Sequence, residues 1–126
     1  ARMHAAPPLW DAMYTLLAEG FRKSGADPAF GLKITQAFLD AGLGWPTIRA
    51  EVPVGGEPGS FLYSWLAATI RSMLPVIEKA GLAHADDIGI ETLAARLEEE
   101  GTRLGAQVTA STQFGGWVRL PGAGDR

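Results

Sequence analysis

The first regular pattern in the chain is a series of apolar residues at three- and four-residue steps between Leu9 and Phe21. This spacing places them along one side of a helix, and we expect that helix to end near Gly25. Residues 1–8 contain two consecutive prolines and no periodicity, so we expect an extended lead-in there. The apolar positions of the expected helix are Leu9, Trp10, Met13, Tyr14, Leu16, Leu17 and Phe21.

The longest helical pattern runs from Pro58 to Gly81, and Ser60 can cap its first turn. Pro75 lacks an N–H group and its ring clashes with a preceding carbonyl, so we expect either a kink or two successive helices. The residues of the wide stripe that should face the core are Phe61, Leu62, Trp65, Leu66, Thr69, Ile70, Met73 and Leu74.

Two shorter helices are also expected. The first begins at Asp27-Pro28, because aspartate caps free N–H groups and proline is tolerated at the first helical position. It ends at Gly42, which suits the left-handed residue after a helix. The second starts at Asp86 or Asp87 and runs to about Gly101 or Leu104, within residues 86–104. Their core-facing residues are Ile34, Ala37, Phe38 and Ala41 in the first, and Ile90, Leu93, Ala94, Leu97 and Leu104 in the second.

Two segments show the alternation of a half-buried strand. In Thr47–Val54 the apolar residues occupy every second position, and Gln113–Leu120 repeats the pattern. Pro53 cannot donate to a β-ladder, so its end of the first strand should lie at an edge. We expect these segments to form an antiparallel strand pair.

The fold class that these elements predict is α/β and mostly helical, with four to five helices and one antiparallel strand pair. An isolated pair of strands is marginally stable, and its outer edges carry unpaired N–H and C=O groups. Both strands are apolar enough to need further partners. The pattern therefore fits the last part of a larger sheet better than a complete one.

Composition narrows the class of protein. The chain has 126 residues, a net charge of −3 and no cysteine, which excludes disulfides and thiol chemistry. Its only histidines, His4 and His84, are far apart, so we expect no metal site. The scattered basic residues argue against nucleic acid, and no apolar run is long enough for a membrane span. We expect a cytoplasmic protein.

Short motifs at the two ends of this pattern resemble a known family. The order of a helix, a strand, a helical insertion and a final strand is similar to the C-terminal part of class I S-adenosylmethionine-dependent methyltransferases, especially small-molecule enzymes of the ubiquinone/menaquinone-biosynthesis type. Val118 stands where glycine is usual. The matching residues are Asp27, Pro28, Gly31, Ala41, Gly42 and Leu43 in the first motif and Trp117, Arg119 and Pro121 in the second.

The resemblance implies that residues 1–126 form one unit, the C-terminal substrate-facing and lid portion of a Rossmann-like methyltransferase, with 121–126 as a mobile tail. The family's Gly-x-Gly-x-Gly loop, which binds S-adenosylmethionine, is absent, so the N-terminal cofactor-binding half would be missing. The glycine clusters "VGGEPGS" and "FGGW" are read as lacking the strand–turn–helix context of a ligand loop. The parent protein would be an enzyme that binds the cofactor, whereas this chain alone would bind none and be inactive.

Five residues are candidates for contact with a small apolar or aromatic substrate. His4 is a candidate general base, although a histidine near a chain start is more often simply exposed. Trp10 and Tyr14 are candidates for substrate binding, with core packing as the more ordinary alternative. Trp65 and Arg71 lie on the inserted helix, where a core tryptophan and a solvated arginine are the alternatives.

A second hypothesis belongs to a different class of protein. The chain would be a non-catalytic helical module for ligand binding or dimerisation, in which strands are exchanged between two copies. The partner would then be a second copy of the chain instead of a missing N-terminal half. A stand-alone enzyme has no support, because the residue types supply no nucleophile–base pair.

Overall fold

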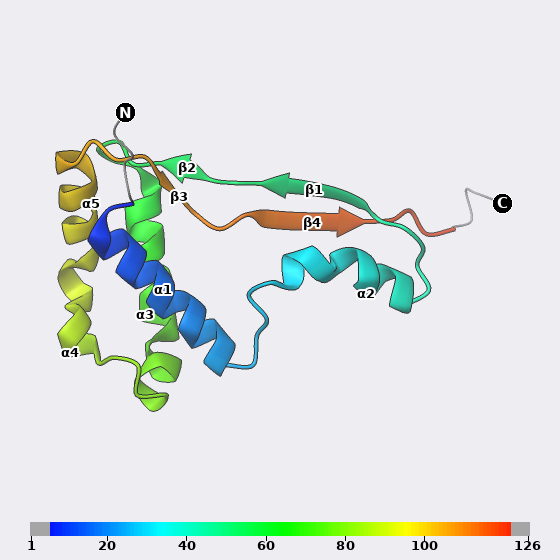
Figure 1. Ribbon diagram of the computed structural model, residues 1–126, viewed down its shortest axis with the longest axis horizontal. Helices are drawn as coiled ribbons and strands as arrows, with labels where there is room; N and C mark the ends of the chain where they lie inside the picture. The colour runs from blue at the N-terminus through cyan, green and yellow to red at the C-terminus, as the bar shows by residue number, and fades with distance from the viewer. Residues whose placement is uncertain (1–5, 122–126) are drawn as a thin grey trace. The chain divides into compact units, whose positions relative to one another are not determined.

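The computed structural model describes residues 6–121, and its elements form two compact units (Figure 1). Unit 1 comprises Ala1–Asp27 and Pro53–Ala110, and unit 2 comprises Pro28–Val52 and Ser111–Arg126. Helices and antiparallel strand pairs occur together, so the prediction of a mostly helical α/β protein is confirmed at this level.

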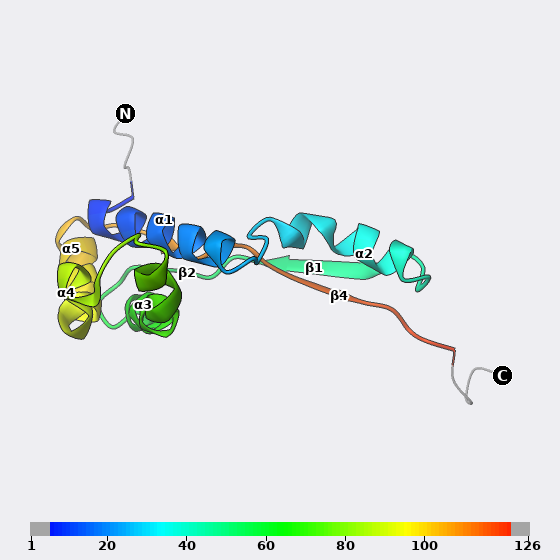
Figure 2. The same ribbon diagram turned by 90° about the horizontal axis from the view of Figure 1, so that it is seen from below.

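Unit 1 is a helical bundle with one short strand pair. Helix α3 packs against both α1 and α5, as Figures 1 and 2 show. The elements of unit 1 are α1 (Pro8–Lys23), β2 (Val54–Gly55), α3 (Phe61–Lys79), α4 (Ala85–Ile88), the 3-10 helix η2 (Ile90–Thr92), α5 (Leu93–Arg103) and β3 (Val108–Thr109). The core is made by Trp10, Leu17, Leu62, Tyr63, Leu66, Ala67, Ile70, Ile77, Ile88, Leu93, Leu97, Val108 and Ala110.

The two long helices follow their apolar patterns closely. Helix α1 begins at Pro8, within the expected lead-in, and ends before Gly25. Ser60 caps α3, since its Oγ accepts a hydrogen bond from the Leu62 N–H at 3.4 Å. Helix α3 continues through Pro75, so the alternative prediction of two successive helices is wrong. Ile77 is completely buried beyond the proline, and its burial favours continuation of the helix.

The helix expected over residues 86–104 is interrupted. Helix α4 ends at Gly89, which has a left-handed φ of 67°, and a 3-10 turn leads into α5. The guanidinium of Arg96 donates to the carbonyls of Ile88 and Gly89 and so satisfies the acceptors freed by the break. Neither adjacent aspartate is the N-cap of α4, because His84 holds that position.

Unit 2 consists of one helix on one face of a two-stranded ribbon, as Figures 1 and 2 show. Strands β1 and β4 are antiparallel, with Thr47 opposite Trp117 and Glu51 opposite Gln113, which confirms the predicted pairing. The elements of unit 2 are η1 (Phe30–Lys33), α2 (Ile34–Asp40), β1 (Thr47–Glu51) and β4 (Gln113–Trp117).

Several predicted element boundaries need correction. The strand predicted over Thr47–Val54 is broken at Pro53, so β1 stops at Glu51 and β2 resumes at Val54. The Pro53 carbonyl accepts a hydrogen bond from the Ala110 N–H at 2.9 Å, next to the unpredicted strand β3. Strand β4 ends at Trp117, three residues before the predicted end.

The helix predicted from Asp27 also starts later than expected. A turn precedes the 3-10 helix η1, which begins at Phe30, and the α-helix itself begins at Ile34. Gly42, with φ of 75°, is left-handed as predicted. The 3-10 helix η1 brings Gly31 against the ring of Phe114 on β4, and an added Cβ on Gly31 would overlap that ring.

The two units differ sharply in burial. Unit 1 has the core listed above, whereas none of the described residues of unit 2 is buried. The predicted core stripe of α2 is therefore wrong: Ile34 and Phe38 are half-buried, and Ala37 and Ala41 are exposed. A single two-stranded ribbon is too narrow to cover a helix.

Candidate functional site

Four aromatic side chains of unit 1 form a contiguous cluster between α1 and α3. The ring centroids of Trp10 and Tyr14 are 5.4 Å apart, and those of Tyr14 and Trp65 are 6.2 Å apart. Tyr63 meets Trp10 edge-on, with centroids 6.1 Å apart and an interplanar angle of 90°. Such tilted and edge-on pairs are favourable arrangements of aromatic rings. Three of the candidate substrate residues therefore lie together.

The members of this cluster differ in exposure, and only the exposed side chains can contact a ligand. Trp10 is only 4% exposed, which favours its ordinary role in the core. Tyr14 and Trp65 are half-buried and pack against that core. Phe61 lies one turn before Trp65 on α3 and is 62% exposed, although the apolar pattern predicted it to be buried. The accessible part of the cluster is therefore an apolar surface on α3 and α1.

Tyr63 anchors the buried end of the cluster, and the sequence analysis did not identify it. Its hydroxyl group donates to the Gly56 carbonyl, and its ring is 2% exposed. Burial raises the pKa of Tyr63 above its usual value, and the charges of Glu98 and Glu57 raise it further. The phenol is therefore neutral, so it acts as a hydrogen-bond donor and not as a base. Its helical spacing to Leu66 and Ile70, which are buried on the same side of α3, could have indicated this role.

The two remaining candidates are not part of the cluster. Arg71 forms an ion pair with Glu91, with 3.1 Å between Nη2 and Oε2, and both side chains are largely exposed. Its hydrogen bond and positive charge lower the pKa of the Glu91 carboxyl group. This arrangement favours the alternative interpretation of Arg71 as a solvated arginine. His4 lies outside the described residues.

The glycine cluster "VGGEPGS" does connect a strand to a helix, β2 to α3, so the expectation that it lacks this context was wrong. Two of its amide groups nevertheless have acceptors, and one of these is the Ser60 N–H, which donates to the Glu57 carbonyl at 2.9 Å. The Gly59 N–H donates to Glu98 Oε1 at 3.3 Å, and Ser60 Oγ caps the helix. A carboxylate thus already lies where an anion would bind. The loop does not fit S-adenosylmethionine.

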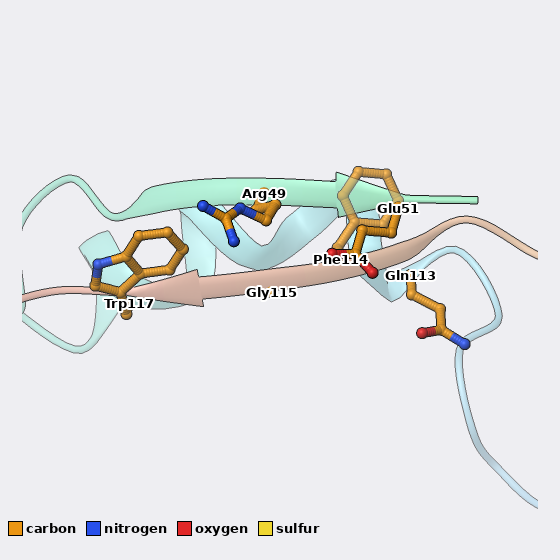
Figure 3. A pocket seen from close by; sticks show the side chains of 6 residues that line it. All are labelled: Arg49, Glu51, Gln113, Phe114, Gly115 and Trp117. Atoms are coloured by element: carbon orange, nitrogen blue, oxygen red, sulfur yellow. The ribbon is translucent and has the colours of Figure 1, made fainter. Parts of the chain in front are cut away.

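The face of the unit 2 ribbon opposite α2 is open. A shallow hollow of about 290 Å³ lies over it, and Figure 3 shows Arg49 extending along the ribbon toward Trp117. An added Cβ on Gly115 would meet no atom within 4 Å, so the centre of the hollow is empty space. Glu51 and Gln113 border its other end. The sequence analysis did not single out this face.

A second hollow of unit 2, of about 540 Å³, lies where β1 begins and β4 ends. Trp45 is 78% exposed and Trp117 is 49% exposed at its rim, beside Arg119. Arg119, a residue of the second motif, is exposed just past the end of β4. The preceding glycine and following proline could have indicated that Trp45 lies in a loop.

Residues 6–121 contain no cluster of three or more histidine, aspartate or glutamate residues that could hold a metal ion. In the same range, no helix combines the length and the apolar character that a membrane span requires. No protein-family model, curated protein or solved structure matches the chain.

Proposed function

We propose that this chain is the substrate-facing C-terminal part of an S-adenosylmethionine-dependent methyltransferase that methylates a small apolar or aromatic molecule. The observation that carries the proposal is the arrangement of unit 2. A helix leads into a strand, a helical segment follows, and the last strand returns antiparallel to the first. This order agrees with the end of a Rossmann-like methyltransferase sheet.

The packing of the motif glycines supports the same reading. Gly31, from the Asp-Pro-x-x-Gly motif, lies against the ring of Phe114 on β4. Gly116, just before the Trp-x-Arg-x-Pro motif, lies against Ile34 of α2, where an added Cβ would be 2.8 Å from Ile34 Cγ2. The helical segment 30–40 lies so close to the ribbon that neither position has room for a Cβ, and only glycine lacks one. The two motifs thus belong to one structural unit.

The exposure of unit 2 is consistent with a missing neighbour. A helix and two strands with no buried residue cannot supply their own core, since folding relies on buried apolar surface. In the proposed enzyme, the free edge of β4 continues into the sheet of the upstream half. That half would bind the methyl donor, because the residues of this chain do not fit it.

The part of unit 1 that would face the methyl acceptor is the accessible aromatic surface. Phe61, Trp65 and Tyr14 present apolar rings that can stack on a flat substrate and exclude water from it. Methyl transfer depends mainly on holding the acceptor in line with the donor, so positioning is the contribution expected of this surface.

The test uses the product of the complete coding sequence that contains this chain. We expect it to bind S-adenosylhomocysteine in calorimetry and to transfer a radiolabelled methyl group to small aromatic acceptors. Trp65→Ala should lower kcat/KM for the acceptor about tenfold without changing affinity for S-adenosylhomocysteine, since about 1.4 kcal/mol of ring contact is lost. Trp65→Phe should retain most of the activity.

The matched control is Leu104→Ala, which truncates an exposed apolar side chain at the end of α5. This change should leave kinetics and binding unaltered. Failure of the complete protein to bind S-adenosylhomocysteine would refute the proposed function, and so would binding by this chain alone. The first result would favour the non-catalytic helical module, whereas binding of the methyl donor by this chain alone would count against both hypotheses.

A further inference from the structure

The outer edge of β1 has no partner strand among the described residues, because only β4 pairs with β1. All five of its residues are exposed. Pro46 precedes the strand and Pro53 follows it, and neither proline can donate to a ladder. An open edge of this kind is a template for another strand, and its pairing is limited to residues 47–52.

The side chains of this edge are sorted by face. Ile48 lies opposite Gly116, which contacts α2, and Ala50 lies opposite Phe114, whose ring contacts η1. Both therefore share the face of the ribbon that the helical segment 30–40 covers. Val52 continues this row. Ile48 is 40% exposed and Val52 is 47% exposed, so both remain available for a partner.

The opposite face carries the charges. Arg49 lies opposite Gly115, and Glu51 lies opposite Gln113, on the open side drawn in Figure 3. Both residues are exposed, so their charged groups are accessible beside the free edge. One basic and one acidic residue, two positions apart, can match the same pair in a reversed copy.

We propose that β1 pairs antiparallel with β1 of a second copy of this chain, in the register centred on Ala50. A two-fold axis perpendicular to the sheet relates the copies, which keeps each row of side chains on its own face. Arg49 then lies opposite the partner's Glu51, and Ile48 lies opposite the partner's Val52.

The neighbouring symmetric registers are unfavourable. Centring the pair on Arg49 places two guanidinium groups opposite each other, and centring it on Glu51 places two carboxylates opposite each other. Like charges directly opposite across strands are destabilising, whereas opposite charges and β-branched apolar pairs are stabilising. Only the Ala50 register satisfies both faces at once.

The pairing converts two ribbons into one four-stranded sheet in the order β4–β1–β1–β4, with the α2 helices on one face. Three or more strands with an apolar face are the usual minimum for a stable sheet. The free edges of the two β4 strands remain at the outside. The inference goes beyond the proposed function and does not depend on it, because an upstream sheet would adjoin β4 and not β1.

The test compares charge reversals by analytical ultracentrifugation over a range of concentrations. We expect the wild-type chain to be a reversible dimer. Arg49→Glu and Glu51→Arg should each weaken it about tenfold or more, since each change converts two attractive pairs into two repulsive ones. Glu57→Arg makes the same charge change on an exposed turn of unit 1 and should leave the dimer intact.

Mixing the two single variants provides the decisive measurement. Their charges are complementary at both positions, so a heterodimer should form at wild-type affinity, and the double variant R49E/E51R should dimerise alone. Recovery on mixing also shows that both variants are folded. A monomeric wild type, unaffected single variants or absence of a heterodimer in native mass spectrometry would overturn the proposal. These results do not involve the methyl donor, so they leave the proposed function standing.

Discussion

Two helical glycines provide a test of how tightly unit 1 is packed. Replacing glycine with alanine in a helix normally stabilises it by about 1 kcal/mol, because alanine has the higher helix propensity. Gly101 on α5 and Gly20 on α1 are both buried, but their surroundings differ. We therefore expect Gly101→Ala and Gly20→Ala to change stability in opposite directions.

At Gly101 the added methyl group would overlap the Tyr63 hydroxyl and lie 3.0 Å from ring atoms Cε1 and Cζ. Tyr63 would have to move, and it would then lose its hydrogen bond to the Gly56 carbonyl. Overpacking costs about 1–3 kcal/mol and a buried carbonyl without a donor costs a similar amount. After the gain in helix propensity, the net loss should be about 2 kcal/mol.

At Gly20 the new methyl group would lie 3.2 Å from Ile77 Cγ1 and 3.6 Å from Met73 Cε. The methionine end is flexible and can yield by a few tenths of an ångström. We expect Gly20→Ala to be neutral or to stabilise the chain by up to about 1 kcal/mol. Urea unfolding followed by far-UV circular dichroism measures both changes. Equal stability of the two variants would refute the packing described for Tyr63.

Three further predictions concern titration and local stability. Tyr63→Phe should lower the free energy of unfolding by about 1 kcal/mol. The pKa of Tyr63 is raised in the folded state, so the stability of the wild type should fall as pH rises above the unfolded pKa of about 10.0. Tyr63→Phe has no phenol to ionise, so its urea midpoint should fall less over the same pH range. The pKa of Glu91 is lowered by Arg71, so Arg71→Met should reduce thermal stability only slightly at pH 7. That difference should vanish as pH falls below about 4.5. In hydrogen exchange, amides of α2 should exchange far faster than those of α3, because unit 2 buries no residue; equal protection would contradict this.

The helical parts of the fold could largely be predicted, because their signals are local. The three- and four-residue steps of α1 and α3 mark their buried sides, and the cap at Ser60 depends on residues within one turn. The antiparallel pairing of β1 with β4 followed from two alternating segments that each required a partner. Each helix or strand among these features was predicted from a pattern within its own segment.

Other features depend on contacts between distant segments. The break at Gly89 is stabilised by Arg96 reaching back to two carbonyls, and periodicity does not report such a bond. Tyr63 is buried because the Gly56 carbonyl accepts its hydrogen bond, although a tyrosine so close to a glycine-rich turn could equally be exposed. Gly31 had no local explanation, since the ring that requires it belongs to β4.

The candidate site was predicted in part for the same reason. The cluster of Trp10, Tyr14 and Trp65 follows from helical spacing, because residues four apart share a side and α1 packs on α3. The exposed face with Arg49 and Trp117 does not follow from spacing, since alternation gives two faces without saying which one a helix covers.

The contrast in burial between the two units indicates which surfaces of the chain are available to partners. Unit 1 has a buried core of its own, and its exposed apolar surface includes the aromatic patch beside Trp65. Unit 2 has two strand edges and one open face, and none of its residues up to 121 is buried, so its apolar surface is stabilised when something pairs with it. An upstream sheet at β4 and a second copy at β1 would occupy different edges. Both can therefore be satisfied in the same assembly, which would join two copies of the chain through one continuous sheet.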